Sequence, residues 1–221
     1  VLFCTKHYLV TNPSVNRLTN SLRCLITFTP SDKLPSVFFG EVGKIIMKFG
    51  YFDTRVDPGG KRSYDQLIDD LREEVVLSEQ AGYDAAWIGE HHMGPEGMDQ
   101  LPNPILMCSD LASRTDHIRL GQAANLLPYW HPIRLAEDIA MLDQMTKGRI
   151  DVAIGRGVRS REGSVFHSKS DPANPDASLE LFEETLDILI KSWTNEFFCH
   201  EGNNYTFPAN NIRWNHPSPK W

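Results

Sequence analysis

Short apolar segments recur along this chain at an almost constant interval, and this interval restricts the possible folds more than any other feature. They begin at Lys48, Ala85, Ile118 and Ile150, so each lies about 32 to 37 residues after the one before. That is the length of one β-strand, one loop and one crossover helix. The spacing therefore predicts a βα repeat built on a parallel sheet, which is the α/β class of fold.

Helix start and stop signals lie between these segments. Ser63 and Gln66 match a capping box, and Gly82 suits the left-handed conformation that ends a helix. Asn103 followed by Pro104 is typical of a helix start, because asparagine caps the first turn and proline lacks only an N–H that would be unpaired there. Together with the apolar spacing, such signals predict four helices, over residues 64–81, 104–114, 132–147 and 179–193.

The segments around the fourth helix differ in character. Residues 158–177 contain serine, lysine and proline but few apolar side chains, so we expect a long loop that acts as a lid or selects the substrate. After the helix, two short apolar-aromatic runs flank Gly202-Asn203-Asn204 and predict a hairpin. The helix itself is expected to bury a face made of Leu179, Phe182, Leu186, Leu189 and Ile190.

Polar or small residues follow three of the predicted strands. Gly89-Glu90-His91-His92 follows the strand at residues 85–88, the run from Leu120 to Pro128 closes the next, and Gly155-Arg156-Gly157 closes the last. The carboxyl ends of parallel strands meet at one edge of a sheet, where barrel and open α/β enzymes keep their active sites. Three strand ends therefore predict one shared site.

The two adjacent imidazoles allow more than one role. Successive side chains alternate across a strand, so at most one of His91 and His92 faces the site unless the strand has already ended. A zinc site would need a third ligand at suitable spacing, and no HExxH pattern accompanies the pair, so no metal is predicted. Glu90 and His91 could instead satisfy each other's hydrogen bonds within a polar layer.

The run Gly155-Arg156-Gly157 also allows two interpretations. It is not a GxGxxG dinucleotide loop, because Ser160 stands where the next glycine would be. Its glycines could simply allow a tight turn. Alternatively, Arg156 binds a phosphate group, since a guanidinium can donate to two phosphate oxygens. Arg159 and Arg161 either extend this positive patch or are solvated loop charges.

Five segments, in chain order and over residues 47–221, resemble the bacterial luciferase-like flavin-dependent monooxygenases. The resemblance implies a (β/α)8 TIM barrel, of which this chain holds about four N-terminal βα units, since a full barrel needs roughly 250 residues. The segments are Met47-Lys48-Phe49-Gly50-Tyr51-Phe52, Gly82-Tyr83-Asp84-Ala85-Ala86-Trp87-Ile88-Gly89-Glu90-His91-His92, Ile118-Arg119-Leu120-Gly121 to Leu127-Pro128 with His131-Pro132, Leu142-Asp143-Gln144-Met145-Thr146-Lys147-Gly148-Arg149, and Gly155-Arg156-Gly157.

The same resemblance implies roles for the strand-end residues. His91 is implied to be a base or hydrogen-bonding group beside the flavin, with Glu90 near the isoalloxazine as a positioning group. Ala123-Ala124 is implied to form a non-proline cis peptide bond that supports one face of the flavin ring. The catalytic residues expected in this way are His91 and Glu90, and the cofactor contacts are Glu90, Ala123, Ala124, Arg156 and Val158.

By resemblance, reduced FMN from a partner flavin reductase reacts with O2 and oxygenates a small organic substrate, and the complete protein forms a homodimer through its second and third helices. Two alternatives stay open. One is an oxidoreductase of the same barrel family that uses the deazaflavin F420, and the other is a non-catalytic flavin-binding or inactive fragment. The position of Gly155 holds a reactive cysteine in the luciferases themselves, so light emission is not predicted.

Residues 1–46 differ from the rest of the chain. They begin without methionine and hold five Lys or Arg against two acidic residues, whereas the whole chain has a net charge of −7. We expect them to be an extraneous or disordered leader, and residues 47–221 to be the N-terminal half of the barrel. Because four βα units leave a sheet edge open, we expect this chain alone to be weakly folded or aggregation-prone, and inactive.

Composition argues against several classes of function. The negative net charge disfavours nucleic acid as a partner, since phosphate binding requires clustered Lys and Arg. The chain has no run of ~20 apolar residues, so no membrane association is expected, and we expect a cytoplasmic protein. Cys4, Cys24, Cys108 and Cys199 are far apart in the chain, which predicts reduced, unpaired thiols.

Overall fold

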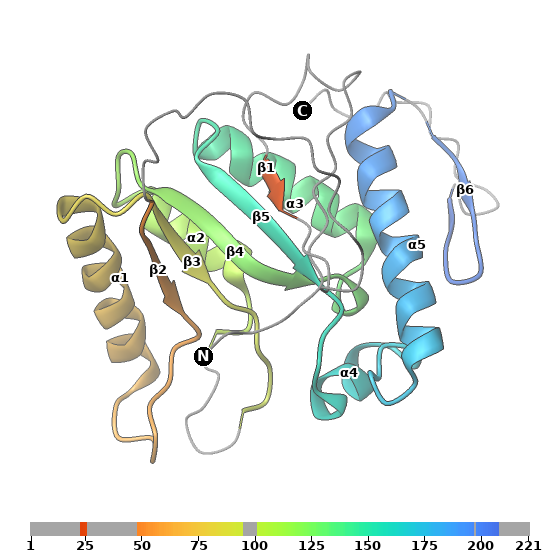
Figure 1. The fold of residues 1–221 in the computed structure, drawn as a ribbon, viewed down its shortest axis with the longest axis horizontal. Helices are drawn as coiled ribbons and strands as arrows, with labels where there is room; N and C mark the ends of the chain where they lie inside the picture. The colour runs from red at the N-terminus through yellow and green to blue at the C-terminus, as the bar shows by residue number, and fades with distance from the viewer. Residues whose placement is uncertain (1–22, 26–47, 95–100, 197, 208–221) are drawn as a thin grey trace, which may run out of the picture.

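The computed structural model describes residues 23–25, 48–94, 101–196 and 198–207. In this part of the chain, five parallel strands form one sheet in the order β1-β5-β4-β3-β2 (Figure 1). The predicted βα array is confirmed, because β2 to β5 pair with their chain neighbours as consecutive strands of a TIM barrel do. The strands are β1 (Arg23–Leu25), β2 (Gly50–Asp53), β3 (Ala85–Ile88), β4 (Arg119–Leu126) and β5 (Ile150–Gly155).

The strand β5 is paired on its outer side with β1, so the sheet ends at β1 and β2. Residues 23–25 run parallel to β5, with Arg23 opposite Asp151 and Leu25 opposite Ala153. A short piece of the predicted leader is therefore a strand of the sheet. The rest of the leader lies outside the described residues.

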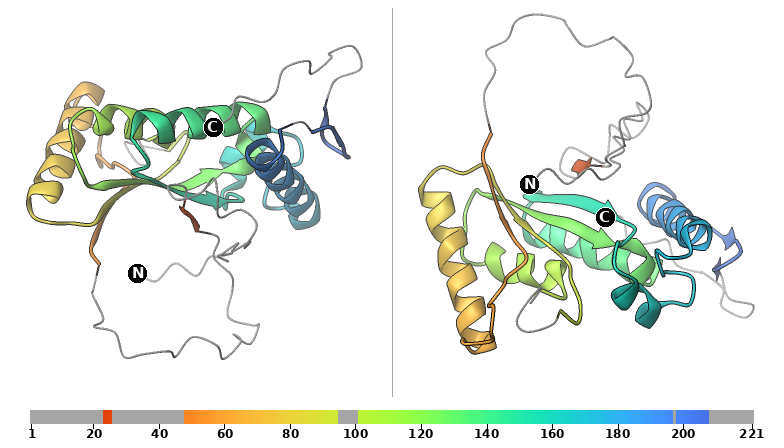
Figure 2. Two further views of the ribbon diagram at one scale, coloured as in Figure 1. Left: turned by 90° about the horizontal axis from the view of Figure 1, so that it is seen from above. Right: turned by 60° about the horizontal axis from the view of Figure 1, so that its bottom comes forward.

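Three helices lie on one face of the sheet (Figure 2). The capping box of the first is confirmed by a hydrogen bond from Ser63 N to Gln66 Oε1 (3.0 Å), and Gly82 has the expected positive φ, +82°. In the second, Leu106 N donates to the capping Asn103 Oδ1 (2.8 Å). The helices are α1 (Tyr64–Gln80), α2 (Pro104–Ala112) and α3 (Pro132–Met145). Within the described ranges, every helix is too short or too polar to span a lipid bilayer.

The fourth predicted helix differs from the expectation in its start and in its buried face. It is α5 (Pro175–Thr194), which begins before Ser178, and both Leu179 and Ile190 are exposed. The helix packs against α3, and its buried face includes small polar side chains, so a pattern of large apolar residues does not reveal that face. The buried face consists of Ser178, Leu181, Phe182, Thr185, Ile188, Leu189 and Ser192.

The segment predicted as a long loop contains a further helix, α4 (Ser160–Phe166). It contacts η3 (Leu127–Tyr129), the short 3-10 helix that follows β4. Glu162 and Gly163 are buried, and Ser170 Oγ donates to Gly163 O (2.5 Å). Because tertiary contacts rather than apolar spacing stabilise this short helix, the sequence pattern does not indicate it.

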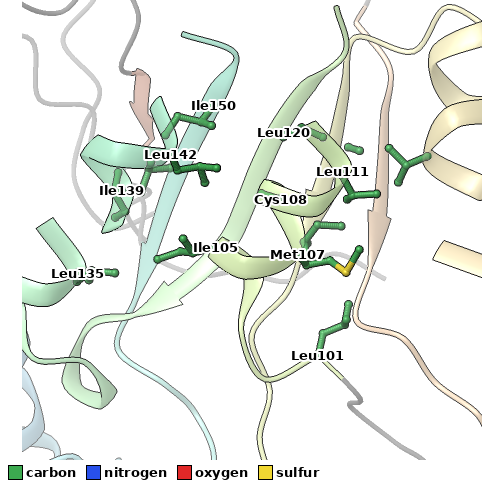
Figure 3. Close-up of a cluster of buried hydrophobic side chains, with 14 of the residues drawn as sticks. Leu101, Ile105, Met107, Cys108, Leu111, Leu120, Leu135, Ile139, Leu142 and Ile150 are labelled. Atoms are coloured by element: carbon green, nitrogen blue, oxygen red, sulfur yellow. The ribbon is translucent and has the colours of Figure 1, made fainter. Parts of the chain in front are cut away.

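The main hydrophobic core lies between the sheet and the helices α2 and α3 (Figure 3). Cys108 is completely buried there, and burial raises the pKa of its thiol to about 12. Cys108 and Cys199 are free, as predicted, whereas Cys4 and the side chain of Cys24 lie outside the described residues. The labelled core residues are Leu101, Ile105, Met107, Cys108, Leu111, Leu120, Leu135, Ile139, Leu142 and Ile150.

The predicted hairpin is present and is attached to α5 by one carboxylate, that of Glu184. Its oxygens accept hydrogen bonds from the backbone N–H groups of Asn204 (3.0 Å) and Tyr205 (2.8 Å), and Oε1 lies 3.0 Å from Nε2 of the buried His200. The antiparallel strands of the hairpin are β6 (His200–Glu201) and β7 (Thr206–Phe207).

We expect acid to release this hairpin from α5. Burial raises the pKa of Glu184, but the hydrogen bonds from His200, Asn204 and Tyr205 outweigh burial and hold that pKa below its ordinary value of 4.5. A carboxylate with a depressed pKa contributes stability that is complete well above pH 4.5 and is lost as the pH falls through the native-state pKa. The amide signals of Asn204 and Tyr205 in ¹H–¹⁵N spectra should therefore shift together, with a midpoint below pH 4.5.

The variant Glu184→Gln should remove this acid step, because the amide side chain does not titrate. Glu183→Gln changes the exposed neighbour and should leave the step in place. A step that persists in Glu184→Gln would contradict the assignment.

Candidate active site

The carboxyl ends of three strands meet, as the sequence predicts. Leu126, the last residue of β4, donates its N–H to Glu90 Oε2 (2.8 Å) just beyond β3, and it is also paired with Gly155 at the end of β5. A Cβ atom on Gly155 would lie 3.4 Å from the Cβ atom of Ala124. The residues that end β3, β4 and β5 therefore surround one region at this edge of the sheet.

Glu90 is a buried carboxylate that joins these strand ends, and it is only 2% exposed. Its oxygens accept hydrogen bonds from Leu126 N (2.8 Å) and Trp130 Nε1 (2.9 Å), and Oε1 lies 3.0 Å from His92 Nε2. The suggested pairing of Glu90 with His91 is thus wrong, and the histidine partner is His92. The reason is that β3 has already ended, so the strict alternation of a strand no longer decides where the two imidazoles point.

His91 lies beside a second buried carboxylate, that of Glu162 on α4. His91 Nδ1 is 3.4 Å from Glu162 Oε1, and the backbone N–H of His91 donates to Leu101 O (3.0 Å). Arg159 Nη1 and Arg161 Nη2 lie 3.3 Å and 4.0 Å from the same carboxylate oxygen, so both arginines help to compensate a buried charge. In the described part of the chain, no three His, Cys, Asp or Glu residues are grouped in a way that could hold a metal ion.

His92, which contacts Glu90, forms an aromatic layer with Tyr129 and Phe166. The His92 ring centroid is 4.5 Å from that of Phe166 and 5.9 Å from that of Tyr129, and the tyrosine and phenylalanine rings stack at 4.9 Å. Burial, and then the negative charges of Glu162 and Glu90, raise the pKa of Tyr129. Its hydroxyl is buried and makes no hydrogen bond within the described residues, so this protonated phenol can donate to a bound group.

The peptide bond between Ala123 and Ala124 in β4 is cis, as the resemblance implies. Both alanines are half-buried, while the flanking Gln122 and Asn125 are fully buried, and Asn125 Nδ2 donates to Gln122 Oε1 (3.4 Å). Sequence reasoning did not single out these two amides, although polar residues within a buried strand are a usable signal. The alanines leave a surface without long side chains between the strand ends.

Arg156 follows β5 directly, and its Nη1 donates to Pro175 O (3.2 Å) at the start of α5. Gly157 has a φ of +86°, and a side chain there would clash with the hydroxyl of Tyr129. Val158, the next residue, is 72% exposed. Of the residues that carry this site, Glu162, Tyr129 and Phe166 were missed by sequence reasoning, because two of them lie in the segment interpreted as a polar loop.

Known proteins have sequences similar to that of this chain. Residues 47–220 match the family model described as luciferase-like monooxygenase. The oxygenase component of the flavin-dependent trigonelline monooxygenase from Acinetobacter baylyi is 32% identical over 162 residues, which cover 73% of this chain and 43% of that protein. This chain spans less than half the length of the curated relatives that it matches.

Solved structures show the same likeness. The oxygenating constituent of 3,6-diketocamphane monooxygenase from Pseudomonas putida, in complex with FMN, has a TM-score of 0.66 and 28% identity, and the match covers 73% of this chain and 44% of that one. An F420-dependent secondary alcohol dehydrogenase has a TM-score of 0.55 at 18% identity over 72% of this chain and 46% of that one, which shows a shared fold alone.

Proposed function

Because this chain belongs to the luciferase-like monooxygenase family, and its described part is an incomplete TIM barrel of that type, we propose that its strand-end site binds FMN and serves a flavin-dependent monooxygenase. The observation that carries this proposal is the meeting of three strand ends, which bear Glu90-His91-His92, Ala123-Ala124 and Arg156. The activity of the whole protein is part of the proposal, since this chain spans less than half the length of its relatives.

The residues at this site suit a flavin. Ala123-Ala124 and Gly155 have no side chain larger than a methyl group, so they leave room for a planar ring. Arg156 carries a guanidinium at the end of β5 and can donate to a phosphate. The protonated hydroxyl of Tyr129, which has no partner within the described residues, can donate to a polar edge of the ring.

Each residue then has a task. Reduced FMN, when bound, supplies the electrons with which O2 oxygenates a small organic substrate. His91 exchanges a proton with the reacting groups, a task that suits imidazole near neutral pH. Glu90 acts as a positioning residue, because it holds His92 and Trp130 in place. The aromatic layer of His92, Tyr129 and Phe166 provides an apolar wall beside the strand ends.

The proposal includes partners. A flavin reductase delivers reduced FMN, and the substrates are O2 and a small organic molecule; a cytoplasmic location goes with these partners. The complete protein is proposed to be a homodimer formed through α2 and α3. In support, Leu106, Met141 and Met145 are exposed apolar side chains on these two helices, and such side chains suit contact with a second copy.

A second candidate is an F420-dependent oxidoreductase, because an F420-dependent alcohol dehydrogenase has the same fold. Titration of the chain with FMN and with F420, followed by quenching of their fluorescence, compares the two cofactors directly. Oxygen uptake then separates the reactions, because hydride transfer to or from F420 consumes no O2. Tighter binding of F420 without oxygen uptake would replace the FMN proposal.

The variant Arg156→Ala is expected to weaken FMN binding by about tenfold or more, because a charge-assisted contact to the phosphate is lost. Fluorescence quenching measures this dissociation constant. Riboflavin lacks the phosphate, so its affinity should not change in the variant. Arg134→Ala, which removes an exposed arginine of α3, is the matched control and should bind both ligands normally. Absence of saturable FMN binding in the wild-type chain would contradict the proposal and favour a non-catalytic fragment.

A further inference from the structure

The two adjacent histidines are approached by carboxylates through different ring nitrogens. Glu90 Oε1 lies 3.0 Å from Nε2 of His92, whereas Glu162 Oε1 lies 3.4 Å from Nδ1 of His91. Both carboxylates are nearly inaccessible, with 1% of each side chain exposed. Glu162 also accepts a long hydrogen bond from His92 N (3.4 Å), so α4 is tied to the residues that follow β3.

A neutral imidazole carries its proton on one nitrogen only, and the hydrogen bond made by that nitrogen decides which one it is. An ionised carboxylate accepts hydrogen bonds and donates none, so an imidazole nitrogen that binds it carries the proton. A carboxylate that accepts a hydrogen bond from one ring nitrogen sets the tautomer of a functional histidine and the orientation of its ring. A carboxylate at Nε2 of His92 and another at Nδ1 of His91 therefore favour opposite tautomers in the two rings.

We propose that Glu162 is a positioning residue for His91: it accepts the Nδ1–H and leaves Nε2 as the nitrogen that exchanges a proton in the reaction. This inference rests on the proposed function, in which His91 is the proton carrier. Nε2 of His91 makes no hydrogen bond to any described residue, so it is available for that task. At 3.4 Å from Glu162 Oε1, the buried Nδ1 makes no hydrogen bond to any described residue, so Glu162 is the nearest acceptor for it. Catalytic hydrogen bonds are often long or poorly aligned before a ligand fills the site.

Two arginines lie near the buried carboxylate of Glu162. Arg159 and Arg161 lie 3.3 Å and 4.0 Å from Oε1 and supply the compensating positive charge, while Oε2 has no hydrogen-bond partner in the described part of the chain. A buried carboxylate is costly unless it is paired in this way. The short helix α4, which the sequence does not predict, thus places the carboxylate of Glu162 beside His91.

Ring ¹⁵N spectra of the chain, recorded above pH 8 and without flavin, test the inference. We expect a protonated Nδ1 on His91 and a protonated Nε2 on His92. In Glu162→Gln, the ratio of Nδ1–H to Nε2–H forms at His91 should fall by about tenfold, the effect of losing one charge-assisted hydrogen bond. His92 should not change. Glu162→Asp retains the charge and should restore part of the Nδ1–H form.

The variant Arg161→Gln is the matched control, because it changes a charge near the same carboxylate without removing the acceptor. It should leave both tautomers as in the wild type, and the dispersion of the amide spectrum reports whether each variant is folded. The inference is overturned if His91 in the wild type carries its proton on Nε2, or if Glu162→Gln leaves its tautomer unchanged. A separate experiment tests the proposed function: if the fluorescence titration detects no FMN binding, the proposed function is wrong.

Discussion

Replacing Glu90 by alanine is expected to lower the free energy of unfolding by about 3 kcal/mol. The buried N–H of Leu126 and the indole N–H of Trp130 both lose their acceptor, and His92 loses its partner at Nε2. Proteins of this size are commonly stable by only about 5 to 15 kcal/mol, so the loss is a large fraction of the total. Urea unfolding followed by circular dichroism measures it.

Two variants sharpen this experiment. Glu90→Gln keeps the volume of the side chain and one acceptor oxygen, so it should be clearly more stable than Glu90→Ala. Glu73→Ala replaces an exposed glutamate of α1 and should change the free energy of unfolding by less than about 0.5 kcal/mol. Equal stability of Glu90→Ala and Glu73→Ala would show that Glu90 does not join the strand ends.

Replacing His91 by alanine is expected to reduce formation of oxygenated product by about 10² to 10⁴, the usual contribution of one general acid–base group. The dissociation constant of FMN should change little, because the contacts proposed for the ring and the phosphate come from Ala123-Ala124 and Arg156. The assay supplies reduced FMN from a flavin reductase, offers a panel of small organic substrates, and identifies oxygenated products by mass spectrometry. The assay uses an active protein that contains this sequence.

The matched control for this variant is His117→Ala, because His117 is a strongly exposed imidazole just before β4, at the opposite end of that strand. It should leave both product formation and FMN binding as in the wild type. Product formation that is unchanged in His91→Ala would remove the histidine from the proposed mechanism. A parallel loss of FMN binding would instead make it a binding residue.

Replacement of Glu90 and replacement of Glu162 are expected to change different properties of this site. The carboxylate of Glu90 contacts the backbone N–H of Leu126, the indole of Trp130 and the imidazole of His92. Its removal is therefore expected mainly to lower the free energy of unfolding. Glu162 approaches His91 from the short helix α4, and its carboxylate also lies near Arg159, Arg161 and the backbone N–H of His92. Replacement of Glu162 is therefore expected mainly to change which ring nitrogen of His91 carries the proton.

Much of the fold could be predicted from local signals. The strand spacing, the capping box at Ser63 and the Asn103-Pro104 helix start depend on residues close together in the chain, and the structure contains each of them. The cis bond at Ala123-Ala124 was predicted from resemblance alone. The face of α5 could not be predicted in the same way, because Ser178 and Thr185 are buried by contact with other elements and not by their own hydrophobicity.

The sequence by itself determined the order of β2 to β5 and of the helices α1, α2, α3 and α5. It also placed Glu90, His91 and Arg156 at the ends of parallel strands, because periodicity, caps and turns are properties of neighbouring residues. Only the tertiary structure decided which partner each group has. Glu90 binds His92 and not His91, and Glu162 lies beside His91 although the two are far apart in the chain. Hydrogen-bond partners of buried charges are set by how distant segments pack, and no local pattern carries that information.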